Sequence, residues 1–191
     1  MDNIRTVCVY AASSARVAQC YVDAARSLGR ILAERRIRLL NGAGCTGLMG
    51  ACSDACLAAG GQVTGVIPRF MVERGWCHAG LSELVVTPDM HVRKETMARR
   101  SDGAIALPGG CGTLEELLEI ITWRQLGLYG GRVVILNVEG FYDPLIAMLE
   151  RTVEQRFMRG EDTALWSVAR TAEEAVGLLA GGAGPETEGG L

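Results

Sequence analysis

The stretch from Pro108 to Glu116 joins a glycine-rich turn to two carboxylates, a combination that could bind an anion and act on it. It reads Pro-Gly-Gly-Cys-Gly-Thr-Leu-Glu-Glu. Three glycines in four positions let backbone N–H groups approach a ligand, and a helix that begins at Leu114 with Thr113 as its N-cap would add the positive end of its dipole. The pattern predicts a phosphate-binding turn.

Glu116 has two interpretations at this stage. Thr113-x-x-Glu116 has the spacing of a capping box, in which the carboxylate only reaches back to the N-cap N–H. Helical periodicity instead places Glu116 beside a buried stripe, close to the anion site. A carboxylate next to a phosphate is repulsive unless a sugar hydroxyl or a reaction uses it. Spacing alone leaves a cap and a catalytic group equally open.

A second group of chemically capable residues is Arg93 and Lys94, which fall near the start of a predicted helix, Met90–Ser101. Both side chains could reach a crevice at the edge of a sheet, although a solvated basic pair has the same pattern. Lys94 is the only lysine of the chain, which favours a role that arginine could not fill. His78 and His91 have no serine or cysteine in a triad-like arrangement, and we predict surface or supporting roles for them.

A second glycine turn lies earlier in the chain, where Gly42, Gly44 and Gly47 follow an apolar run. Their spacing formally matches the dinucleotide fingerprint, but the turn comes after the second predicted strand, and the next strand offers no acidic residue for a ribose 2′-hydroxyl. A tight structural turn and a nucleotide contact remain open. The sequence has no P-loop pattern, so phosphoryl transfer of that kind is not predicted.

Short apolar runs that alternate with helical patterns must position these residues. The predicted strands are Thr6–Tyr10, Ile37–Leu40, Val63–Ile67, Leu84–Val86, Ala104–Leu107 and Val133–Leu136. The predicted helices are Ala18–Glu34, Gly47–Ala59, Met90–Ser101, Leu114–Leu126 and Pro144–Phe157. Strands that are apolar throughout indicate a parallel sheet with helices on both faces, an α/β, Rossmann-like, doubly wound fold. Pro68–Pro88 has no clean period, and we predict a loop excursion there.

Composition narrows the classes of function. The chain of 191 residues is 49% hydrophobic with a net charge of −3, which fits one globular domain over residues 1–180 and argues against a nucleic-acid partner. Seven cysteines without zinc-type spacing predict a cytoplasmic protein with neither disulfides nor a metal site. We expect neither a signal peptide nor a membrane span. Residues 181–191, rich in glycine and glutamate, are expected to be disordered.

Three segments in register resemble one family. Met90-His91-x-Arg93-Lys94, the Pro108–Glu116 stretch and Ile121-Thr122-Trp123-x-Gln125-Leu126-Gly127 are together similar to the LONELY GUY (LOG) proteins, phosphoribohydrolases of cytokinin riboside 5′-monophosphates that are often labelled possible lysine decarboxylases. The resemblance runs from about Val7 to Phe157. It implies a Rossmann-like homodimer that hydrolyses the N-glycosidic bond of an adenosine-type 5′-monophosphate, with no metal or organic cofactor.

The resemblance also implies roles for individual residues. Arg93 and Glu116 would be the catalytic pair. The expected contacts to the nucleotide, including both glycine turns and the loop after the first strand, are Glu73, Lys94, Gly109, Gly110, Gly112, Thr113, Thr122, Gly42, Gly44, Gly47 and Ser13. The sequence departs from many members at Ala11-Ala12-Ser13-Ser14 and at Gly42-Ala43-Gly44, and in the length of Gly75–Gly80. These departures bear on which base is preferred.

Two alternatives stay beside this interpretation. A nucleotide-binding or carrier module could use the same glycine turns without turnover, although it would have little use for Glu116 beside a phosphate. Lysine decarboxylation would need pyridoxal phosphate on a lysine, and only Lys94 could serve. Cleavage of a ribosyl C–N bond suits the residues better, since a carboxylate can stabilise an oxocarbenium-like sugar and orient water.

Overall fold

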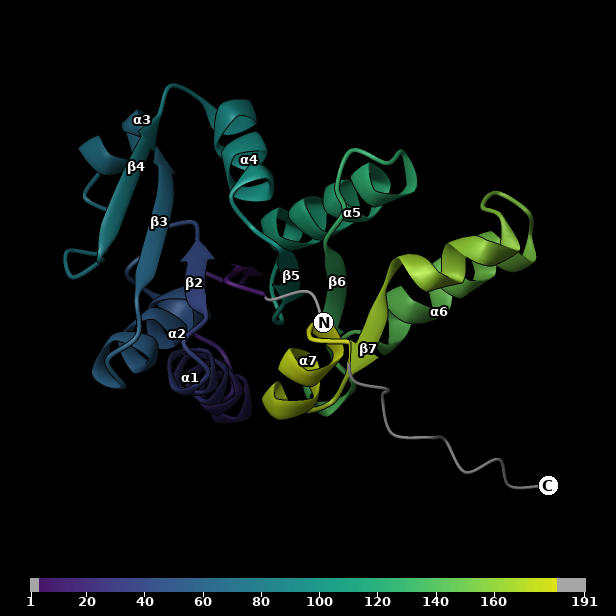
Figure 1. The fold of residues 1–191 in the computed structure, drawn as a ribbon, viewed down its shortest axis with the longest axis horizontal. Coiled ribbons are helices and arrows are strands. Elements are labelled where there is room, and N and C mark those ends of the chain that lie inside the picture. The colour runs from purple at the N-terminus through teal and green to yellow at the C-terminus, as the bar shows by residue number, and fades with distance from the viewer. Residues whose placement is uncertain (1–3, 182–191) are drawn as a thin grey trace.

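A computed structural model describes residues 4–181, and these fold around one parallel seven-stranded sheet (Figure 1). Its strands are β1 (Thr6–Tyr10), β2 (Arg38–Asn41), β3 (Val63–Pro68), β4 (Glu83–Thr87), β5 (Gly103–Ala106), β6 (Arg132–Leu136) and β7 (Ser167–Ala169), in the order β4-β3-β2-β1-β5-β6-β7. Every neighbouring pair is parallel. The helices are α1 (Gln19–Glu34), α2 (Gly47–Ala58), α3 (Arg69–Glu73), α4 (Met90–Arg99), α5 (Cys111–Gln125), α6 (Asp143–Glu154) and α7 (Ala172–Leu179), with short 3₁₀ turns at Val138–Gly140 and Gly160–Leu165.

Alternation along the strands divides the core into two layers. In β1, Val7 and Val9 pack into the cluster that contains α1, α2 and α7, whereas Cys8 and Tyr10 face the cluster that contains α4, α5 and α6. Figure 1 shows these two groups of helices on opposite sides of the sheet. Both faces are therefore covered, as the uniformly apolar strands predicted, and the doubly wound fold is confirmed.

The strand order places a ligand crevice at the centre of the sheet. The chain runs outward in one direction from β1 through β2 to β4, and in the other from β5 to β7. Helices that follow β1 and β5 accordingly lie on opposite faces, which leaves a gap outside the carboxyl ends of these two strands. Two hydrogen bonds fix the loops that border the gap. The N–H of Ala12 donates to the Pro108 carbonyl (3.3 Å), and the N–H of Met49 donates to the Ala12 carbonyl (3.2 Å).

The predicted elements are present with shifted ends, and two regions differ. Strand β4 is present where Leu84–Val86 was predicted, but the earlier part of Pro68–Pro88, expected as a loop, contains the helix Arg69–Glu73. Residues 74–80 fold back so that Gly44 and Cys77 form an antiparallel bridge. The sequence also missed β7 and α7. A strand of three residues and a helix of eight are too short for periodicity to identify. Of the expected disordered tail, residues 182–191 lie outside the described part of the chain.

Candidate active site

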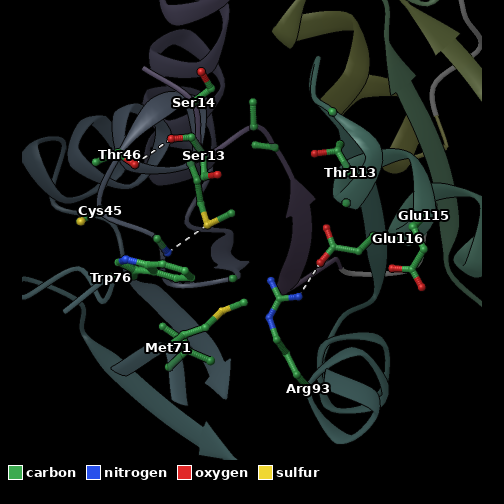
Figure 2. Close-up of a pocket in the computed structure, with 18 of the residues that line it drawn as sticks. Ser13, Ser14, Cys45, Thr46, Met71, Trp76, Arg93, Thr113, Glu115 and Glu116 are labelled. Carbon is green, nitrogen blue, oxygen red and sulfur yellow. Dashed lines mark hydrogen bonds and ion pairs between the residues drawn. The ribbon is translucent and has the colours of Figure 1, made fainter. Parts of the chain in front are cut away.

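A cavity of about 540 Å³ opens at the switch point between β1 and β5. Loops from both halves of the sheet form it, together with α4 and the start of α5. Figure 2 shows its labelled side chains. The lining residues are Ala11, Ala12, Ser13, Ser14, Gly42, Gly44, Cys45, Thr46, Met49, Ile67, Met71, Trp76, Met90, Arg93, Gly110, Gly112, Thr113, Glu115 and Glu116.

Arg93 and Glu116 form a buried ion pair in this cavity. Nη1 of Arg93 donates to Oε1 of Glu116 at 2.7 Å, and the two side chains are only 7% and 9% exposed. Nε of Arg93 donates to the carbonyl of Val66 at 3.1 Å, so the guanidinium is held by two elements at once. Asp89, the N-cap of α4, accepts from the N–H of Val92 and fixes the turn that carries Arg93. The pair is thus preorganised on α4 and α5.

Burial changes the proton affinity of Glu116. Removal from water raises the pKa of this carboxyl above its ordinary value, and the charge and hydrogen bond of Arg93 oppose that rise without cancelling it. A carboxylate in such a place stabilises a nearby positive charge strongly, because little water screens it. It can also accept a proton from water at a pH where an exposed glutamate would be too weak a base.

The glycine turn after β5 supplies the start of α5, and one prediction about it was wrong. The helix begins at Cys111 with Gly110 as N-cap, not at Leu114 with Thr113 as cap. Thr113 lies inside the first turn, where a Cβ on Gly109 would come 2.1 Å from its Oγ1. The capping box with Glu116 does not form, because that carboxylate accepts from Arg93 instead. Gly110 and Gly112 have open space where a Cβ would be, so their backbone is accessible from the cavity.

The turn after β2 makes room for the ion pair. A Cβ on Gly42 would come 2.1 Å from Nη2 of Arg93. Side chains brace this turn: Oδ1 of Asn41 accepts from the N–H of Ala43 at 2.9 Å, and Nδ2 of Asn41 donates to Ser53 Oγ at 2.8 Å. The N–H of Gly44 points at the sulfur of Met49, 3.0 Å away. Gly42 is therefore needed for the position of Arg93, a role that the fingerprint-like spacing did not indicate.

Most of the predicted site residues meet in the cavity, and some lie elsewhere. Arg93, Glu116 and six of the expected contacts line it, namely Ser13, Gly42, Gly44, Gly110, Gly112 and Thr113. Gly109 and Gly47 lie behind the lining, where they pack against Thr113 and against the backbone of Ser13 and Ser14. Glu73 is exposed at the end of α3, and Oγ1 of exposed Thr122 donates to the Leu118 carbonyl. As contacts to a ligand, the residues in the lining and these four residues all stay predictions.

Lys94 differs from the expectation that it reaches the crevice. Its ammonium group bonds to Glu115 and, at 3.0 Å, to Glu119 on α5, and its side chain does not line the cavity. Burial lowers the pKa of Lys94, but the two carboxylates outweigh burial and the net shift is upward. Of Arg93 and Lys94, only Arg93 lines the cavity, because one residue further along α4 the side chain turns to Glu115 and Glu119, away from the cavity.

Several lining residues were missed by the sequence analysis. Met49, Met71, Met90 and Trp76 add apolar side chains to the cavity lining. Met71 and Trp76 form an apolar wall that faces Glu116 and Thr113 across the cavity (Figure 2). Methionine and tryptophan carry no spacing signal for a site, and Met71 and Trp76 belong to the segment expected to be a loop. The cavity thus has one end with backbone donors, a charged floor and one apolar wall. Such a site suits an amphiphilic anion with a sugar-sized polar centre.

Comparison with known proteins identifies relatives over most of the chain. A family model described as "Possible lysine decarboxylase" matches residues 49–179. The cytokinin riboside 5′-monophosphate phosphoribohydrolase LOG5 of Arabidopsis thaliana is 43% identical over 178 residues, which are 93% of this chain and 78% of that protein. LOG1 of the same plant, with the same activity in its name, is 44% identical over 93% of this chain and 84% of its own length.

Solved structures share the fold at lower identity. The molybdenum cofactor binding protein of Rippkaea orientalis aligns with a TM-score of 0.72 at 20% identity, over 95% of this chain and 98% of that one. The Moco carrier protein of Chlamydomonas reinhardtii aligns with a TM-score of 0.71 at 21% identity, over 94% and 97%. At this identity the likeness shows the architecture alone.

Proposed function

This chain belongs to the family of the cytokinin riboside 5′-monophosphate phosphoribohydrolases, and from that premise we propose that it hydrolyses the N-glycosidic bond of adenosine-type 5′-monophosphates. The products are the free base and ribose 5-phosphate. The observation that carries the proposal is the buried Arg93–Glu116 pair at the floor of the cavity, next to a glycine turn with accessible backbone. A site that only binds could use the carboxylate for a sugar hydroxyl, whereas C–N bond cleavage uses it to stabilise the charged ribosyl ring and to activate water.

The cavity accepts the substrate in one orientation. The 5′-phosphate lies at Gly110, Gly112 and Thr113, where the positive end of α5 and its free N–H groups attract an anion. The ribose then lies over Glu116, and the base against the apolar wall. The opposite orientation would place the phosphate among methionines and the base on exposed N–H groups, which is unfavourable for both.

Bond cleavage in this orientation uses the pair as follows. The C1′–N9 bond breaks with its electron pair leaving on the base, and positive charge builds on the ribosyl ring. Glu116 stabilises this charge and takes a proton from the water that adds its oxygen to C1′. Arg93 holds the carboxylate in place through its second bond to Val66. The departing base is protonated by solvent, so atoms and charge balance without a cofactor.

Lysine decarboxylation, which the family description names, would need pyridoxal phosphate, and these residues do not fit that cofactor. A Schiff base would need an uncharged lysine in the cavity. Lys94 is the only lysine of the chain, its pKa is raised, and its ammonium group is held by two carboxylates on α5 outside the cavity lining. We derive no decarboxylation step for this protein.

A panel of ligands tests the proposed function. Purified protein is incubated with AMP, an N6-isopentenyl AMP, adenosine and IMP, and the free base is separated by chromatography. We expect release from monophosphates and little from adenosine, which lacks the group that the turn binds. Binding by calorimetry with the ligand intact after long incubation would replace the hydrolase by a nucleotide-binding or carrier module.

We further propose that the protein is a homodimer. A groove of about 390 Å³ between α4 and α5 is bordered by Val92, Trp123 and Leu128. Leu118 on α5 and Leu126, the C-cap of that helix, are also exposed. Apolar side chains gathered on one face favour association with a second copy. Light scattering at several concentrations should give twice the monomer mass, and Leu126→Glu should shift it toward the monomer. A monomeric wild type would contradict this proposal.

The cytoplasm is the proposed location. All seven cysteines are free thiols, which is typical of a reducing compartment. Within residues 4–181, the helices are too short or too polar to cross a membrane. Fractionation of cells that express the tagged protein checks this location.

A further inference from the structure

Trp76 occupies an unusual position for a large aromatic residue. It is 49% exposed, yet it lines the cavity, and it reaches inward from the wall opposite Glu116 and Thr113 (Figure 2). Core packing does not account for it, since neither hydrophobic cluster of buried residues includes it. A ring that is left half free inside a polar cavity is available to a ligand.

The ring is also held in place before any ligand arrives. The guanidinium of Arg74 lies 5.2 Å from its centroid and 5.5 Å from that of Phe70, so that Arg74 stacks with two aromatic rings. Arg74 does not line the cavity. One face of the indole is therefore covered from outside, and the free surface is directed inward.

The backbone around Trp76 is tied on both sides. The N–H of Trp76 donates to the Met71 carbonyl at 3.2 Å, and its own carbonyl accepts from the N–H of Cys45 at 3.2 Å. Two residues on, His78 bonds through Nε2 to Asp54 on α2 at 2.8 Å, and its Nδ1 accepts from the N–H of Gly80 at 3.0 Å. These bonds fasten the segment to α2 and to the glycine turn after β2. Preorganisation of this kind reduces the entropy lost on binding.

The wall that carries Trp76 has few side chains that could form hydrogen bonds with the edge of a base. Within residues 4–181, no Asn, Gln, Asp or His side chain lines the cavity. The carboxylates and Arg93 lie on the opposite wall and the floor, next to the expected ribose (Figure 2). The hydroxyl groups of Ser13, Ser14 and Thr46 also line the cavity, and that of Thr46 already donates to the Ser13 carbonyl at 2.7 Å. The contribution of Trp76 and the methionines to recognition of the base comes from its flat face, through stacking and apolar contacts.

We infer that Trp76, clamped by Arg74, is the specificity-determining residue for the base: it stacks on purine rings, with or without an N6 substituent, and disfavours pyrimidines. The inference rests on the proposed function for the place of the ribose and phosphate. Stacking depends on ring area, so a purine gains more from the indole than a pyrimidine does. A substituent on N6 lies in the plane of the ring and leaves the stacked face unchanged.

Equilibrium binding separates this role from a structural one. Affinities of AMP, UMP and ribose 5-phosphate are measured by calorimetry for two proteins, Glu116→Gln and the double variant Glu116→Gln with Trp76→Ala. The Glu116→Gln change keeps the nucleotides intact. We expect Trp76→Ala to weaken AMP binding about 10-fold or more, in line with the contribution of aromatic stacking to nucleobase binding. Ribose 5-phosphate should change less than about 2-fold, and the preference for AMP over UMP should largely disappear.

Two further variants serve as controls. Trp76→Phe keeps an aromatic face and should retain most of the AMP affinity. Phe70→Ala removes the other ring that Arg74 contacts, lies outside the cavity lining, and should change AMP affinity less than about 3-fold. Equal losses for AMP and ribose 5-phosphate in Trp76→Ala, or an unchanged AMP-to-UMP ratio, would overturn the inference.

The outcome for the inference is independent of turnover. If no base is released by the wild type but AMP binding still depends on Trp76, the hydrolase proposal fails and the stacking role stands. If base release is observed and Trp76→Ala leaves the preference for purines intact, the stacking role fails and the hydrolase proposal stands.

Discussion

Replacement of Arg93 by lysine tests whether the two hydrogen bonds of the guanidinium, to Val66 and to Glu116, position the carboxylate. Lysine keeps the positive charge but cannot reproduce this geometry. Arg93 bonds from Nε to the Val66 carbonyl and from Nη1 to Glu116, two atoms that one ammonium group cannot serve in the same positions. One hydrogen bond to a charged group is lost, which costs about 1.5–3 kcal/mol of unfolding free energy. For a chain of this size, that corresponds to a fall in Tm of roughly 3–12 °C.

The same change should reduce catalysis. Glu116 loses its fixed orientation, and a displacement near 1 Å can lower kcat by about 100-fold. Urea unfolding at fixed protein concentration measures the first effect and base release from AMP the second. Arg99→Lys on the same helix is the matched control: its side chain is 78% exposed and pairs only with Glu95, so unfolding free energy should change by less than about 0.5 kcal/mol. If the two variants behave alike in both assays, the ion pair does not organise the site.

Three further predictions concern the carboxylate, the glycine turn and the loop anchor. Glu116→Gln should stay folded and lose at least about 100-fold in kcat. Because burial raises the pKa of Glu116, the acid limb of the wild-type kcat/KM profile should lie above the pH at which an exposed glutamate titrates. An acid limb at or below that pH would contradict the role. Gly110→Ala meets no protein atom, so Tm should be unchanged while KM for AMP rises, and an unchanged KM would remove the phosphate from this turn. Asp54→Asn weakens the bond to His78, and we expect faster amide exchange around Trp76 with little change in global Tm, measured by mass spectrometry; unaltered exchange would mean that this bond does not hold the segment.

Much of the fold followed from periodicity because the strands are long enough and apolar on both faces. The sequence also indicated that each glycine turn follows a strand, but the switch point between β1 and β5 became visible only with the strand order. Strand β7 was not predicted, because its three residues are too few to show a period. Strand β4 was found, but the helix Arg69–Glu73 before it was not, since five residues carry no clear period.

The site residues were predictable where the residue type limits the chemistry. They were not predictable where the role of a side chain depends on which other residues it contacts in the fold. Glu116 could not be assigned from spacing, because Thr113-x-x-Glu116 also fits a capping box, and only the 2.7 Å contact with Arg93 excluded the cap. Lys94 was misplaced because neighbours on a helix differ by about 100° in direction, and the partners on α5 were unknown. Gly42 lines the cavity as its predicted ligand contact requires, and spacing gave no sign that the absence of a Cβ there also leaves room for Nη2 of Arg93.

The central claim is that this cavity cleaves a ribosyl C–N bond with water through Glu116. The most direct measurement follows AMP, free adenine and ribose 5-phosphate in one reaction without added inorganic phosphate, for the wild type and for Glu116→Gln. We predict that adenine and ribose 5-phosphate appear in equal amounts as AMP disappears, and that Glu116→Gln binds AMP but forms neither product. Intact AMP in the wild-type reaction, or equal product formation by Glu116→Gln, would contradict the account.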